Sequence, residues 1–273
     1  MPAKLTLSFS KTSPKGDVTT ICLIGKNGDI IPRLEKDVAA HLIRTMALAQ
    51  FTGKLGKSLM IYTDTKRYLL LGTDDKLAAG TEAEILGGKL FSSLNGTASK
   101  LGWMPDHKLA PEVLADILFG ANLASYHFDR YFTEKEIDDV TVRLCVGGNA
   151  LSGKARVHQD RQALANGVFF ARDLVFEPAN KLYPVEFANR CVGLTSLGLE
   201  VEVLDEEAME KLGMGALLGV GQGSRRESRM VVMNWKGGGD EPPIAFIGKG
   251  VTFDTGGISL KPPKGMEDMK WDM

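Results

Sequence analysis

Several features that would define a common class of protein are missing from this 273-residue chain. It has only three cysteines, Cys22, Cys145 and Cys191, and they are far apart, with no CxxC pair. A thiolate zinc site, a redox dithiol and a disulfide framework are therefore not expected, and buried reduced thiols are. The sequence also lacks the HExxH motif of helix-borne zinc proteases and the GxSxG elbow of serine hydrolases.

Long apolar runs and an excess of charge are missing too. No run reaches the roughly 18 residues of a membrane-spanning helix, and the N-terminus has no apolar signal segment, which predicts a cytoplasmic protein. The 33 basic and 34 acidic residues give a formal net charge of −1, which argues against nucleic acid or another polyanion as a partner. With 273 residues, of which 44% are hydrophobic, the chain can bury a hydrophobic core large enough to be stable without disulfide bonds or a structural metal.

Short apolar runs alternate with helical patterns along the whole chain. The predicted strands are 5–9, 18–24, 58–62, 67–71, 140–146, 199–204, 230–235 and 243–248. The predicted helices are 35–51, 77–101, 110–132, 154–176, 185–197 and 206–212. This alternation is typical of an α/β layer sandwich, and a Gly-Gly-Asn break at 147–149 suggests a domain boundary near residues 150–160.

The residues that carry chemistry gather near the C-terminus. The apolar run 244–247 leads into a glycine-flanked loop with Lys249, Asp254 and Lys261, and Asp272 follows shortly after. In α/β proteins ligands bind where strands end in loops, so two carboxylates and a lysine there fit either a metal site or a phosphate site. A lysine joins a metal site only as the neutral amine, which desolvation and a nearby cation both favour. The plain alternative is a solvated loop with ordinary surface charges.

Four segments then resemble one known family. The segment Gly248–Lys261 looks like the signature of the cytosol (leucyl) aminopeptidase family of two-metal exopeptidases. The segments 172–180, 212–224 and 123–131 are similar to further family segments, in the same order. The resemblance implies an N-terminal macro-domain-like α/β layer sandwich at 1–150. A linker helix and the first part of an α/β/α catalytic domain with a mixed sheet would follow at 151–273.

The resemblance also implies roles for single residues. Lys249, Asp254 and Asp272 match metal ligands, with Lys249 as a neutral amine and Asp254 as a bridge between two metals. Lys261 matches a charged catalytic lysine that faces the scissile carbonyl oxygen, and Met269 falls where the family lines the pocket for the first side chain. Lys249, Asp254, Lys261 and Met269 would thus contact substrate.

The chemistry implied is metal-assisted hydrolysis. Two divalent ions, Zn or Mn with Mg or Co as alternatives, would lower the pKa of a bridging water that attacks the carbonyl. One of them would bind the free α-amine, so the substrates would be peptides with a free N-terminus, leucine-like residues preferred. The family resemblance further implies a cytoplasmic homohexamer.

One departure from the family pattern qualifies these expectations. The family continues after the position of Asp272 with an Asn-Thr-Asp-Ala-Glu-Gly-Arg segment, which supplies two more metal ligands and an arginine and is not among these residues. We therefore expect a fragment or truncated product, with apolar faces exposed and with little or no peptidase activity of its own.

Two other functions stay open at this point. Residues 56–58, Gly-Lys-Ser, look like the tail of a P-loop, although Phe51 stands where the leading glycine should be. A macro-domain-like N-terminal half also suggests a non-catalytic module that binds ADP-ribose or another nucleotide, or that acts as a scaffold.

Overall fold

The computed structural model describes residues 3–31, 34–74, 77–97, 100–105, 109–133, 140–147 and 151–272, without the side chains of 3, 31, 140, 151–158 and 272. The chain forms two compact units, Met1–Phe169 and Phe170–Met273, each described here by itself. The domain ranges expected from the sequence, 1–150 and 151–273, stay a prediction. No helix in the described ranges is both long enough and apolar enough to cross a bilayer.

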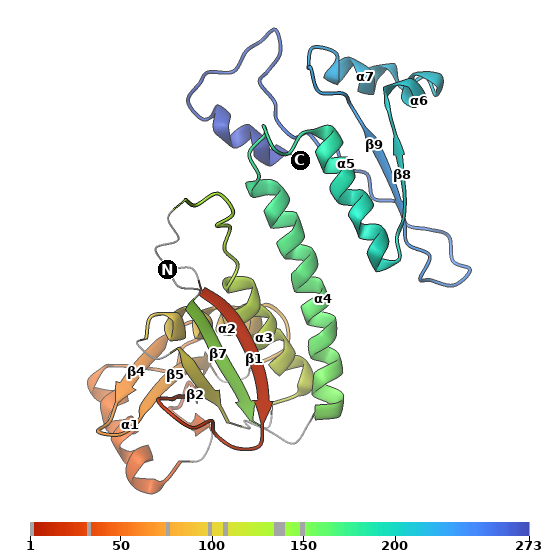
Figure 1. The fold of residues 1–273 in the computed structure, drawn as a ribbon. Coiled ribbons are helices and arrows are strands. Elements are labelled where there is room, and N and C mark those ends of the chain that lie inside the picture. Colours follow the sequence, from red (N-terminus) through yellow and green to blue (C-terminus); the bar gives the residue numbers. More distant parts are fainter. Residues whose placement is uncertain are drawn as a thin grey trace. The chain divides into compact units, whose positions relative to one another are not determined.

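A mixed β-sheet forms the middle of the first unit (Figure 1). Its strands are β1 (Ala3–Ser10), β2 (Thr19–Gly25), β3 (Ile30–Ile31), β4 (Ser58–Tyr62), β5 (Arg67–Asp74), β6 (Leu101–Met104) and β7 (Val140–Gly147). Their order is β1-β7-β6-β2-β5-β4, with β3 paired to β2. All neighbours are parallel except β4 on β5 and β3 on β2, which are antiparallel. The expected α/β fold is confirmed.

Helices cover both faces of this sheet. They are α1 (Lys36–Leu48) on one face and α2 (Thr81–Asn95) with α3 (Pro111–Ala124) on the other. A fourth helix, α4 (Leu151–Phe176), contacts α3 and runs on into the second unit. Side chains alternate across a strand, so in β5 Leu69 and Leu71 pack against α2 and α3, whereas Tyr68 and Leu70 pack in the cluster that contains α1. An apolar run of this kind predicts a strand covered on both faces, as observed.

Two glycines let α2 and α3 approach closely. A Cβ on Gly87 would lie 1.9 Å from the carbonyl oxygen of Ile117, and a Cβ on Gly120 would lie 2.0 Å from that of Glu84. No real side chain fits at such distances, so the helix pair needs glycine at both positions. By contrast, a Cβ on Gly88 meets nothing nearer than 3.8 Å.

A buried carboxylate ties three helices of the first unit together. Asp116 in α3 is 1% exposed and accepts a hydrogen bond from the backbone N–H of Gly80, the residue before α2, at 2.7 Å. It also accepts one from Nε of Arg161 in α4 at 2.6 Å. Because buried charges need partners of this kind, Asp116 determines how these helix segments meet.

The second unit contains shorter elements. They are α5 (Pro184–Val192), the 3₁₀ helix η1 (Gly193–Leu197), β8 (Glu200–Leu204), α6 (Glu206–Lys211), α7 (Gly215–Gly221), β9 (Met230–Asn234) and the 3₁₀ helix η2 (Met266–Asp272). β8 and β9 form an antiparallel two-stranded sheet. Between β9 and η2 the chain runs as loops and turns, and this stretch carries the predicted site.

The structure corrects three predicted elements. The predicted strand 243–248 is wrong: this segment is irregular, and Ile244, Phe246 and Ile247 are almost fully exposed. A strand needs a partner for its backbone hydrogen bonds, and the described residues supply none there. The predicted helices 77–101 and 110–132 are too long, because α2 ends at Asn95 and α3 at Ala124. The strand β6, which begins at the last residue of the first of these ranges, was missed.

Candidate metal and substrate site

The loop 254–261 folds back on itself through three backbone features. The N–H of Gly256 donates to Oδ1 of Asp254 at 2.8 Å, which makes a tight turn around the carboxylate. The N–H of Lys261 donates to the carbonyl oxygen of Thr255 at 2.9 Å and closes the loop. Gly256 and Gly257 both have positive φ, +90° and +62°, which glycine adopts readily. The glycine pair of the motif thus serves the turn.

This closure brings together three of the predicted site residues. Nζ of Lys261 lies 2.9 Å from Oδ2 of Asp254 and 2.8 Å from Sδ of Met269, which belongs to η2. The side chains of Lys261 and Asp254 are 33% and 45% exposed, so the pair is reached by solvent. A carboxylate, a cation and a thioether therefore meet at one accessible point of the second unit.

The electrostatics of the site favour the charged carboxylate. The hydrogen bond from the Lys261 ammonium lowers the pKa of Asp254 below its ordinary value, and the hydrogen bond from the Gly256 N–H lowers it further. Desolvation opposes these two hydrogen bonds to a lesser extent, and the positive charges of Lys261 and Lys249 lower the pKa of Asp254 by smaller contributions still. Lys249 is exposed and close enough to act on Asp254 through its charge.

Asp272, the remaining predicted metal ligand, has a described backbone but no described side chain. It is the last residue of η2, the same short helix that carries Met269. Among the side chains that are described, no three from His, Cys, Asp and Glu come together as a metal site. The structure thus brings Asp254, Lys261 and Met269 into contact and places Lys249 near them.

The donor groups at this point fit part of a divalent-cation site. A carboxylate has about four lone-pair positions, and each oxygen of Asp254 accepts one hydrogen bond in the loop. Each oxygen therefore keeps a position for a cation, as a bridging ligand requires. Carboxylate oxygen and a neutral amine are ligands that Zn²⁺ and Mn²⁺ accept.

The helix η2 is held by a contact with the C-terminal end of α4. Nζ of Lys270, next to Met269, donates to the carbonyl oxygen of Phe176 at 3.3 Å and lies 5.9 Å from the centre of the Phe176 ring. The next residue, Glu177, is fully buried and bonded to Arg190 of α5 at 3.0 Å. Sequence reasoning assigned no role to Glu177 or Arg190, although Glu177 lies inside the segment 172–180.

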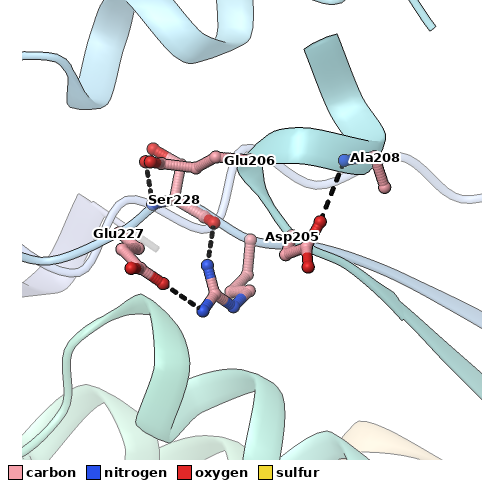
Figure 2. Close-up of polar contacts among 6 residues, drawn as sticks. Asp205, Glu206, Ala208, Glu227 and Ser228 are labelled. Carbon is pink, nitrogen blue, oxygen red and sulfur yellow. Dashed lines mark hydrogen bonds and ion pairs between the residues drawn. The ribbon is translucent and has the colours of Figure 1, made fainter. Parts of the chain in front are cut away.

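A second polar cluster in this unit has a structural role. Figure 2 shows Asp205 accepting the N–H of Ala208 at 2.9 Å, which caps α6, and Glu206 accepting the N–H of Ser228 at 2.8 Å. Arg229 pairs with Glu227 and donates to the carbonyl oxygen of Ser228. These groups satisfy one another and join α6 to the loop before β9.

The segment that resembles the tail of a P-loop lies near the carboxyl ends of β2 and β5. Here the loop 53–57 lies directly over the strand ends: a Cβ on Gly53 would be 2.3 Å from the Gly25 carbonyl oxygen, and the N–H of Asp74 donates to the Gly53 carbonyl at 3.0 Å. The N–H of Leu55, the residue before the Gly-Lys-Ser segment that resembles a P-loop tail, donates to the carboxylate of Asp74 at 3.2 Å. The Asp74 carboxylate thus already accepts a hydrogen bond from the Leu55 N–H, which a bound phosphate would otherwise accept.

Comparison with protein-family profiles gives two matches. Residues 25–135 match the profile described as "Cytosol aminopeptidase family, N-terminal domain". Residues 169–273 match the profile described as "Cytosol aminopeptidase family, catalytic domain". The two matches follow each other in the order of the chain, and the second contains the loop 254–261.

Curated proteins and solved structures agree with these profiles. The chain is 46% identical over 243 residues to a "Probable cytosol aminopeptidase" of Caulobacter vibrioides, covering 85% of this chain and 49% of that protein. It is 40% identical over 290 residues to a protein of the same name from Brucella ovis, covering 100% of this chain and 58% of that protein. The chain thus spans about half the length of these relatives.

Two solved structures share the fold. A mutant of tomato leucine aminopeptidase superimposes with a TM-score of 0.80 at 21% identity, covering 98% of this chain and 57% of that one. The bottromycin maturation enzyme BotP in complex with Mn gives a TM-score of 0.70 at 24% identity, covering 94% and 53%.

Proposed function

Because the chain belongs to the cytosol aminopeptidase family, we propose that it is part of a metal-dependent aminopeptidase that removes N-terminal amino acids, leucine-like residues preferred, from peptides. In this proposal residues 1–150 form the N-terminal domain, and 151–273 form the linker helix and the first part of the catalytic domain. The observation that carries it is the loop 254–261, which holds a carboxylate against an ammonium in the part that matches the catalytic profile.

Asp254, Lys249 and Asp272 would hold two divalent cations. Asp254 keeps a lone-pair position on each oxygen, and Lys249 is near enough to act on its charge. When bound, such cations polarise a carbonyl group and lower the pKa of a water molecule. Zn and Mn are the leading candidates, with Mg and Co as alternatives, and the Mn complex of BotP supports Mn.

Lys261 would stabilise the negative charge that develops on the scissile carbonyl oxygen. Its ammonium has three N–H groups, and the contacts with Asp254 and Met269 use two of them. The third is available to a substrate oxygen. Lys261 would act as an oxyanion donor through this third N–H group.

Met269 would contact the side chain of the residue to be removed. It is half-buried in η2, and its thioether already lies against the Lys261 ammonium. A flexible, polarisable side chain at this place suits an apolar leucine-like group. Substrate would therefore meet the apolar and the charged part of the site side by side.

Activity, cytoplasmic location and assembly into a homohexamer are proposals for the whole protein. For the 273 residues alone we expect little or no turnover, because Lys249, Asp254 and Asp272 are three ligands for two cations, whereas one catalytic metal usually takes three protein ligands. Self-association and location would be checked by light scattering and cell fractionation.

The test is complementation. The chain would be co-expressed with the part of the Caulobacter vibrioides relative that lies beyond the match, and hydrolysis of leucine p-nitroanilide would be measured with Mn²⁺ or Zn²⁺. We expect activity from the pair, its loss in Asp254→Ala and Lys261→Ala, and its retention in Lys264→Ala, an exposed lysine in the same loop region. An inactive pair, or full activity of both site variants, would overturn the proposal.

A further inference from the structure

Gly256 lets the site loop close, and its part in the turn has a consequence for the chemistry of the site. Gly256 has a φ of +90°, and a Cβ there would lie 2.2 Å from the carbonyl oxygen of Ser259. The same Cβ would lie 3.0 Å from the backbone nitrogen of Lys261 and 3.1 Å from its Cγ. The first contact is with backbone, so a side chain at 256 can be accommodated only if the returning limb of the loop moves away.

That limb carries the ammonium of the site. Lys261 reaches Asp254 only because its N–H returns to the Thr255 carbonyl, and this return passes over the place where a Cβ of residue 256 would be. Gly256 also donates its own N–H to Oδ1 of Asp254, while Lys261 donates to Oδ2. One residue therefore orients the carboxylate directly and makes room for its cationic partner.

We propose that Gly256 is a positioning residue, which holds the Asp254 carboxylate and the Lys261 ammonium in the arrangement that the aminopeptidase reaction needs. The inference rests on the proposed function, because positioning matters only if Asp254 binds a cation and Lys261 faces the substrate. Carboxylates that bind metals are themselves held by hydrogen bonds, and such supporting groups affect metal affinity strongly.

The neighbouring glycine offers a matched control. Gly257 also has a positive φ, +62°, but a Cβ there would meet nothing within 4 Å. This φ lies in the left-handed region, which other residues enter at a modest cost. Alanine at 257 therefore brings backbone strain without a collision, whereas alanine at 256 brings both.

The first experiment needs no metal. The wild-type chain, Gly256→Ala and Gly257→Ala would be treated briefly with an amine-acylating reagent, and the modification of Lys261 would be measured by peptide mass spectrometry against the exposed Lys264. We expect Gly256→Ala to raise the relative rate at Lys261 by about threefold or more, as the ion pair opens, and Gly257→Ala to change it by less than about 1.5-fold. Equal rates in wild type and Gly256→Ala would overturn the inference.

Circular dichroism separates positioning from general stability. The loop is at the surface, so we expect both variants to keep the wild-type spectrum and melting temperature within a few degrees. If Gly256→Ala lost its native spectrum while Gly257→Ala kept it, the glycine would serve the fold and the positioning role would be wrong.

A second experiment distinguishes this inference from the proposed function. Mn²⁺ binding to the same proteins and to Asp254→Asn would be followed by electron paramagnetic resonance. We expect wild type to bind, Asp254→Asn and Gly256→Ala to bind at least about tenfold more weakly, and Gly257→Ala to bind like wild type. Loss in Asp254→Asn with full binding in Gly256→Ala would overturn the positioning role alone, and no binding by wild type would overturn both.

Discussion

The ion pair between Arg190 and Glu177 allows a quantitative test of how the second unit is held. Glu177 has no exposed surface, and the Arg190 side chain is 20% exposed and also bonded to the half-exposed Glu186 at 3.0 Å. Arg190→Ala removes the guanidinium from a buried carboxylate. Breaking a pair of this kind on one side costs about 3 kcal/mol in the free energy of unfolding, because a buried charge loses its compensation.

An exposed pair in the same unit is the control. Glu207 and Lys211 lie at i and i+4 of α6, and the carboxylate and ammonium are 2.6 Å apart, but their side chains are 75% and 71% exposed. Lys211→Ala should cost only about 0.3–0.5 kcal/mol, since water screens such pairs.

Urea unfolding followed by far-ultraviolet circular dichroism measures both losses. With a slope of about 2 kcal/mol per molar, Arg190→Ala should lower the midpoint of the transition that reports the second unit by about 1.5 M, and Lys211→Ala by about 0.2 M. The reasoning fails if the two variants shift the midpoint equally, because burial would then not decide the strength of the pair.

Two further predictions concern the first unit. Gly87→Ala should destabilise it by more than about 2 kcal/mol, because the new Cβ collides with the Ile117 carbonyl oxygen. Gly88→Ala meets no such contact and should stabilise the unit by up to about 0.5–1 kcal/mol through helix propensity. Chemical denaturation measures both free energies of unfolding, and equal effects of the two variants would contradict the close helix contact. Burial raises the pKa of Cys22 from 9.0 to about 12, so its thiolate at pH 8 should be about a thousandfold rarer than in an ordinary cysteine, and 5,5′-dithiobis(2-nitrobenzoate) should label it only after unfolding. The stability contributed by this protonated thiol should be complete below pH 9.0 and lost as pH rises towards about 12, because the unfolded chain releases the proton first; rapid labelling of the native protein, or stability constant over that range, would refute this.

The strands that the sequence predicted well share a physical cause. In β5, successive side chains are buried on alternate faces, so burial on both faces leaves a continuous apolar run that composition reveals. The segment 243–248 has the same composition and is not a strand, because pairing depends on a neighbour that no local pattern shows. For β6 the situation is reversed, because it is a strand although its local sequence does not favour one. Its Gly102 weakens strand propensity, yet the packing needs it, since a Cβ there would lie 2.7 Å from Leu94.

The residues of the site loop could be predicted from the sequence, whereas the ion pair that supports this unit could not. The residue types in 249–261 and the family resemblance pointed to Lys249, Asp254 and Lys261. The buried pair of Glu177 and Arg190 was not foreseeable, because the two residues are 13 positions apart on either side of a turn and neither has a pattern of its own. A glutamate after an apolar helix end reads as a surface residue until its burial is known.

The range of the contacts explains why the site motif is so compact in sequence. Asp254 is held by groups two and seven residues away, and Lys261 by groups seven and eight residues away. Such a loop takes its shape mainly from its own turn residues and needs little from the other elements of the unit. A contact of longer range, between Lys270 and Phe176, 94 residues apart, joins η2 to the end of α4. A variant in the loop should therefore disturb the carboxylate and the ammonium without unfolding the unit, whereas a variant at Arg190 should act on the whole unit. The two kinds of change can be told apart by comparing lysine labelling with urea midpoints in the same proteins.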